Sequence, residues 1–132
     1  FAVISINNES DIFEDVSATI KPNDRNFIVH MIEGRIFFPN NFKKFKIKLN
    51  EISNDIQLIF SNKNFKIEEG THSYDRKSPT YIKYFDISGG RVVIACVNWS
   101  ESLEKTKGFV DELKLSITND EFMKWINEEA YN

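Results

Sequence analysis

Two runs of strand-like residues, 81–87 and 91–97, meet at the dipeptide Gly89-Gly90 and predict a β-hairpin. We expect the two glycines to form its two-residue loop, because both can adopt positive φ at little steric cost. The second run contains the segment VVIACV and is apolar on both faces. A strand of this kind usually lies inside a sheet that is covered on both sides. We therefore expect the hairpin to lie in the middle of a packed domain.

Further short apolar segments predict the other strands of the sheet. A run from 27 to 38 is divided at Glu33-Gly34, which we interpret as a hairpin turn rather than as a bulge in one long strand. From 45 to 49, apolar residues alternate with lysines, a period of two that is typical of a strand with one buried face. The remaining strand-like segments are 1–6, 16–20, 56–60, 65–67 and 113–117.

The end of the chain predicts an amphipathic helix. Thr118 and Glu121 have the spacing of a capping box, and Phe122, Trp125 and Ile126 then fall on one side at helical spacing. We therefore expect a mainly β fold of the α+β class. It is predicted to be an antiparallel β-sandwich or barrel-like sheet of about seven or eight strands with a C-terminal amphipathic helix.

Length and charge narrow the range of functions. The chain has 132 residues, the size of one domain, and we expect 1–132 to form a single globular domain. Its net charge of −3 gives no general attraction to nucleic acid, so no nucleic-acid partner is expected. No apolar run reaches the roughly 20 residues of a transmembrane segment. The single cysteine, Cys96, lies in the apolar hairpin strand, and we expect it to be buried and unreactive.

The common sequence motifs for catalysis, metal binding and cofactor binding are missing. There is no phosphate-binding glycine loop, no CxxC pair, no nucleophile elbow and no paired histidines. We therefore expect no cofactor, no metal ligand and no catalytic residue. Of the two histidines, His30 shares a face with Ile28 and Ile32, and we predict a hydrogen-bonded histidine of the core or of a groove.

The second histidine lies in a polar stretch from 68 to 80, which we predict to be the longest loop. This loop leads into the open end of the hairpin, and loops carried by a rigid sheet often hold binding residues. A triad of Ser73, His72 and Asp75 is disfavoured, because adjacent residues rarely point at one another. The candidate binding residues of the loop are His72, Tyr74, Asp75 and Arg76.

Two other groups of charged residues have both a functional and a structural interpretation. The lysines of segment 43–48 resemble a nucleic-acid strip, but the alternation places Phe45 on the face opposite Lys44 and Lys46. We interpret these lysines as protection of an exposed strand. A nuclease-like set of two acids and one lysine can also be drawn, as is nearly always possible in a chain with 20 acidic residues. Its members are Asp55, Lys66 and Glu68.

From these observations we expect a small non-enzymatic binding protein that acts through a protein-protein surface. Sheet edges and the loop around His72 form that surface, and the partner is expected to be a protein. The first alternative is a carrier of a small apolar ligand in a cavity between sheets. The second alternative is a small hydrolase or nuclease. The chain starts at Phe1 instead of methionine, which favours a processed and exported protein, periplasmic or secreted.

Overall fold

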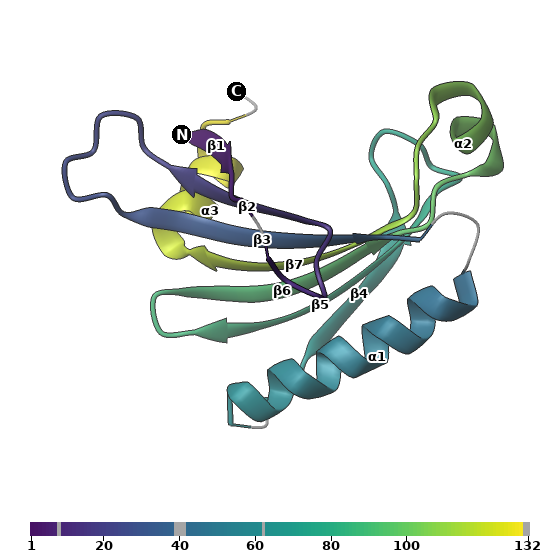
Figure 1. Ribbon diagram of the computed structural model, residues 1–132, viewed down its shortest axis with the longest axis horizontal. Coiled ribbons are helices and arrows are strands. Elements are labelled where there is room, and N and C mark those ends of the chain that lie inside the picture. The colour runs from purple at the N-terminus through teal and green to yellow at the C-terminus, as the bar shows by residue number, and fades with distance from the viewer. Residues whose placement is uncertain (8, 39–41, 62, 131–132) are drawn as a thin grey trace.

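The computed structural model describes residues 1–7, 9–38, 42–61 and 63–130. Within this part of the chain, seven strands form one open antiparallel sheet in the order β1-β2-β3-β7-β6-β5-β4 (Figure 1). The strands are β1 (Ala2–Ser5), β2 (Asp15–Ile20), β3 (Val29–Phe37), β4 (Lys66–Thr71), β5 (Pro79–Ile87), β6 (Gly90–Val97) and β7 (Glu112–Asn119). The helices are α1 (Phe42–Ile59), α2 (Glu101–Lys107) and α3 (Asp120–Glu128).

Helix α1 covers one face of the sheet, whereas α2 and α3 lie on the other side at opposite ends of the strands (Figure 1). The centre of the core is β6, where Val92 and Ile94 are 0% exposed. Strand β6 is the second strand of the predicted hairpin, and it lies between β5 and β7, as its apolar sequence predicted. The residues of α1 in this core have the spacing of a single helical stripe. They are Phe45, Leu49, Ile52 and Ile56.

The predicted α+β fold is confirmed, with seven antiparallel strands and a helix at the C-terminal end. The predicted cap of that helix is wrong by one residue. Asn119 precedes α3, and its side-chain oxygen accepts a hydrogen bond from the backbone N–H of Phe122 at 2.9 Å. Thr118 lies one residue earlier in β7, which ends at Asn119. An asparagine in this position satisfies one of the unpaired N–H groups of the first helical turn.

The strands predicted at 45–49 and 56–60 are wrong, because residues 45–49 and 56–59 belong to α1, and residue 60 is in the turn that follows it. Phe45 and Leu49 are four residues apart, a spacing that fits both a strand period of two and one turn of a helix. The buried residues that follow, Ile52 and Ile56, continue the helical spacing and are off the strand period. A five-residue window therefore could not distinguish the two structures, whereas the 18 residues of α1 do.

The predicted hairpin turn at Glu33-Gly34 is also wrong, because β3 is one continuous strand through this point. Gly34 pairs with Val16 of β2 and with Leu115 of β7. A Cβ on Gly34 would lie 2.7 Å from the ring of Phe13, so the glycine makes room for that ring against the sheet. The irregularity of β3 lies elsewhere, where the pairing with β2 shifts between Thr19 and Ile20.

The loop of the predicted β-hairpin is Ser88-Gly89 and not Gly89-Gly90. Gly89 has the positive φ that was expected, 77°, but Gly90 already pairs with Ile87 as the first residue of β6. Gly90 also lies opposite Asn119 of β7, where a Cβ would come within 2.2 Å of the carbonyl oxygen of Thr118. The first glycine therefore makes the turn, and the second lets two strands approach closely.

The loop predicted at 68–80 is shorter than expected. Residues 68–71 pair with β5 as part of β4, which leaves 72–78 as the connection between the two strands. Strand β4 forms one edge of the sheet, and all six of its residues are exposed. The polar sequence of this segment did not predict a strand, because β4 has no buried face and is held by backbone pairing with β5 on one side.

The close approach of β6 and β7 predicts that Gly90→Ala destabilises the fold. The new methyl group forces a backbone shift, and we expect the free energy of unfolding to fall by about 1–3 kcal/mol. Urea unfolding followed by circular dichroism measures the loss. Gly70→Ala on β4 is the control, because its Cβ would meet only Thr80 Oγ1 at 3.9 Å. Equal stability of the two variants would contradict the close approach.

The position of Cys96 predicts a thiol that does not react in the native protein. Its side chain is 2% exposed, and burial raises its pKa to about 12. Almost no thiolate is therefore present at pH 8, and we expect iodoacetamide to modify the folded protein much more slowly than the same protein in urea. Mass spectrometry measures both rates, and rapid labelling of the native chain would place the thiol at the surface.

Candidate functional site

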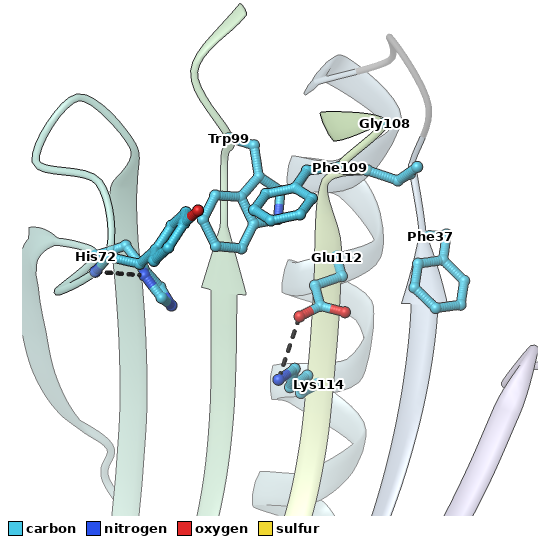
Figure 2. A pocket seen from close by; sticks show the side chains of 9 residues that line it. Phe37, His72, Trp99, Gly108, Phe109, Glu112 and Lys114 are labelled. Carbon is cyan, nitrogen blue, oxygen red and sulfur yellow. Dashed lines mark hydrogen bonds and ion pairs between the residues drawn. The ribbon is translucent and has the colours of Figure 1, made fainter. Parts of the chain in front are cut away.

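An open pocket of about 740 Å³ lies at one end of the sheet (Figure 2). Two connections meet there: residues 72–78, between β4 and β5, and residues 98–111, which contain α2. Their contact follows from the β5–β6 pairing, which continues in a hydrogen bond from the Asn98 N–H to the carbonyl oxygen of Pro79 at 3.0 Å. The pocket is lined by Phe37, His72, Tyr74, Trp99, Gly108, Phe109, Val110, Glu112 and Lys114.

The walls of the pocket are aromatic. The ring centroid of Trp99 lies 4.6 Å from that of His72 and 4.8 Å from that of Phe109. The ring of Tyr74 lies 6.0 Å from Phe109. These separations are in the range in which aromatic pairs attract each other beyond simple burial. Residues that are distant in the sequence therefore form one continuous aromatic surface.

The floor of the pocket comes from the sheet. Phe37 of β3 pairs with Glu112 of β7, so both side chains lie on the same face. The Lys114 ammonium lies 3.2 Å from a carboxylate oxygen of Glu112 (Figure 2). Leu113, between them, is 0% exposed and belongs to the core on the α1 side. The pleat of β7 thus divides its residues between the core and the pocket.

Asp75 holds the 72–78 connection in place. Its Oδ2 accepts hydrogen bonds from the hydroxyls of Ser78 at 2.7 Å and Ser100 at 2.6 Å. The Ser78 hydroxyl oxygen in turn accepts the Ser100 N–H at 2.9 Å. The hydroxyls of Ser100 and Ser78, followed by the N–H of Lys77, lower the pKa of Asp75 below its ordinary value of 3.8. A single carboxylate therefore joins the two connections that form the pocket.

A second aspartate fixes the aromatic wall. Asp111 is 5% exposed, and its Oδ1 accepts the backbone N–H of Trp99 at 2.7 Å. Burial raises the pKa of Asp111, and the hydrogen bond from Trp99 opposes that rise. The backbone at Trp99 is thus held between Asp111 on one side and the Ser100 contact with Asp75 on the other.

The structure separates the candidate binding residues of the loop. His72 and Tyr74 line the pocket, and the Nδ1 atom of His72 accepts the Tyr74 N–H at 3.1 Å. Asp75 points toward Ser78 and Ser100 and acts on the pocket by positioning its wall. Arg76 is exposed and lies outside the residues that line the pocket.

The disfavoured triad does not form, because His72 Nδ1 accepts a backbone N–H and the Asp75 carboxylate accepts two serine hydroxyls. The nuclease-like set is divided as well. Asp55 is on α1, which covers one face of the sheet. Lys66 and Glu68 belong to the edge strand β4, and their side chains lie on the other face. They pair there with Tyr84 and Ile82 of β5.

The other histidine, His30, is 1% exposed at the opposite end of the sheet. Its Nδ1 atom accepts a hydrogen bond from the side-chain amide of Asn119 at 3.0 Å and lies 3.5 Å from a carboxylate oxygen of Glu121. Phe1 packs edge-on against its ring with the centroids 4.9 Å apart. The predicted buried, hydrogen-bonded histidine is therefore present.

Sequence reasoning missed the wall residues Trp99 and Phe109. A signal for Trp99 was available, because it lies two residues after the second strand of the hairpin, at the end into which the 72–78 connection leads. No corresponding signal marks Phe109, which reaches the pocket because α2 ends at Gly108 in the left-handed conformation. Phe109 N–H then donates to the carbonyl oxygen of Leu103 at 3.5 Å.

Comparison of the chain with protein-family models, with curated proteins and with solved structures finds no match. Among the described residues, no helix has the length and the apolar character needed to cross a membrane. Within the same ranges, no cluster of three or more His, Cys, Asp or Glu side chains has a metal-binding arrangement. The function must therefore be inferred from the chemistry of the pocket.

The two serine contacts predict that Asp75→Asn destabilises the protein at neutral pH. Because the pKa of Asp75 is lower in the folded state, its stabilising effect is present above about pH 4 and is lost as the pH falls through the folded value. We expect the variant to unfold at lower urea concentration than wild type at pH 7, with the difference shrinking toward pH 3. Asp55→Asn on the exposed surface of α1 is the control, and a difference that is constant with pH would contradict the ionised contact.

Proposed function

We propose that this protein is a small non-enzymatic binding protein that holds part of a protein partner in the aromatic pocket. The observation that carries the proposal is the convergence of Tyr74, Trp99 and Phe109 on an open pocket whose floor is the sheet. Tryptophan and tyrosine are enriched at protein interfaces, where a few aromatic residues in well-packed pockets supply most of the binding energy.

The shape of the molecule favours a surface site over an internal one. Tyr74 is 64% exposed, so its ring is available to a partner without rearrangement of the fold. The carrier alternative places its ligand between two sheets, but the described chain has one sheet, with Ile94 and Leu113 fully buried in the core beneath α1. The pocket lies outside that core, on the other face.

The contacts of His72 favour recognition over proton transfer. Its Nδ1 atom is engaged by the Tyr74 N–H, and its ring packs on Trp99. A catalytic histidine is normally oriented by a carboxylate or a carbonyl oxygen and directed at a nucleophile. Here the imidazole completes the wall instead.

Strand β4 gives a partner a route to this pocket. It is an exposed edge strand, and it leads directly into residue His72. Exposed sheet edges can pair with an extended segment of another chain through backbone hydrogen bonds. A partner segment paired with β4 would reach the wall of the pocket, which joins the sheet edge and the loop in one binding surface.

Selection from a displayed library of random peptides tests the proposed function. We expect the wild-type protein to enrich a family of related sequences, and Tyr74→Ala to weaken their binding about tenfold or more, because truncation of a central aromatic residue removes much of the interface energy. Titration calorimetry with synthetic peptides measures the affinities.

Tyr81→Ala is the matched control for this selection. Tyr81 is also an exposed tyrosine, 42% accessible, but it pairs with Cys96 on the α1 side of the sheet. We expect this variant to bind the selected peptides as wild type does. A library that yields no sequence family, or peptides that bind Tyr74→Ala undiminished, would remove the proposed function from this pocket.

A further inference from the structure

We infer that the pocket binds a cationic group, the ammonium or guanidinium of a Lys or Arg side chain presented by the partner. This inference rests on the proposed binding function and adds the chemistry of the group that enters the pocket. Three features carry it: the tilt of the rings, the carboxylates behind and below them, and the position of a lysine of the chain itself.

The rings of the pocket are inclined to one another and are not stacked in parallel. The planes of Trp99 and Phe109 are inclined by 60°, those of His72 and Trp99 by 54°, and those of Tyr74 and Phe109 by 46°. In inclined pairs the edge of one ring meets the face of the next, so the rings do not cover one another completely as parallel stacked rings do, and Trp99 and Phe109 remain half-buried where they line the pocket (Figure 2). The face of an aromatic ring carries partial negative charge and attracts cations, tryptophan most strongly.

Carboxylates reinforce this preference on the side of the pocket formed by Trp99. Glu112 lies in the floor with its side chain 14% exposed, and Asp111 lies behind the wall, bonded to the Trp99 N–H. The pKa of Glu104 on α2 is raised first by desolvation and then by the negative charges of Asp111 and Glu101. A cation entering the pocket would therefore approach the Glu112 carboxylate in the floor, with the Asp111 carboxylate behind the Trp99 wall.

Lys114 shows that the floor already accommodates an ammonium group. Its Nζ atom lies 3.2 Å from Glu112, and its side chain is 31% exposed. A purely apolar ligand would cover this ion pair without compensation, which is unfavourable. An anion would gain Lys114 but would face the Glu112 carboxylate and the negative faces of the rings. A cation gains from both the rings and the carboxylate, in competition with Lys114.

Choline and its uncharged isostere 3,3-dimethyl-1-butanol test the inference with the intact chain. The two probes have the same shape near the quaternary centre and differ in charge. We expect choline to shift the indole N–H resonance of Trp99 saturably in NMR spectra, leave that of Trp125 unchanged, and bind about five- to thirty-fold more tightly than the isostere. Trp125 is the reference because it packs with Phe1 and Phe122 at the other end of the sheet.

Two substitutions in the floor predict opposite effects on choline binding. Glu112→Gln removes the negative charge at nearly constant shape, and we expect weaker binding. Lys114→Gln removes the competing ammonium, and we expect tighter binding. Tyr81→Ala lies on the other face and is the control that leaves the affinity unchanged. Thermal melting of each variant shows whether the fold is retained.

The outcomes separate this inference from the proposed function. If the isostere binds as well as choline, or if Lys114→Gln weakens choline binding, the cationic specificity is wrong. Selected peptides that require Tyr74 but share an apolar or acidic residue would keep the binding function and overturn the inference. Selected peptides with a shared Lys or Arg, whose replacement by Gln abolishes binding, would support both. If choline binds but no peptide family is selected, the preference of the pocket for cations is supported and the proposed binding of a protein partner is wrong.

Discussion

The apolar stripe of α1 packs against the middle strands of the sheet, and the positions of the other elements depend on this contact. Each fully buried aliphatic side chain at this interface, such as Ile94 or Leu113, contributes about 1.5–3 kcal/mol. The same contact fixes which residues face the other way, because side chains alternate along a strand. A slip of one residue in β7 would exchange Leu113 for Glu112 in the core, so the covered face also determines the floor of the pocket.

The pocket walls depend on a different kind of interaction. The connections that carry Tyr74 and Trp99 bury little apolar surface, and aspartate side chains fix their backbone. Asp75 joins the two connections through serine hydroxyls, and Asp111 binds the N–H of Trp99. Hydrogen bonds to charged acceptors are short and strong, which suits segments without a core of their own. A rigid sheet and two bonded carboxylates thus hold an exposed aromatic surface in one arrangement.

The parts of this structure that sequence predicted are those in which local pattern and tertiary environment agree. The apolar strand with Cys96 indicated the interior of the sheet, and the polar run with His72 indicated the connection that forms a pocket wall. Helix α1 was missed because Phe45 and Leu49 satisfy two periods at once. Trp99 and Phe109 were missed because the rest of the site forms where separate connections converge. The place of Trp99 after the hairpin strand was a signal, whereas no local pattern marks Phe109.

The exposed edge strand β4 has a consequence for how the site moves. An edge strand that pairs on one side and buries little side-chain surface has a low free energy of local unfolding, so β4 is expected to fray more often than the rest of the sheet. The connection that follows it is fastened through Asp75 to Ser100, beyond the interior strand β6. Fraying of β4 therefore frees the end of the 72–78 connection that follows β4. The hydrogen bond between Asp75 and Ser100 still holds the rest of that connection. Motion of the edge and persistence of the pocket can thus occur on separate timescales within one short stretch of chain.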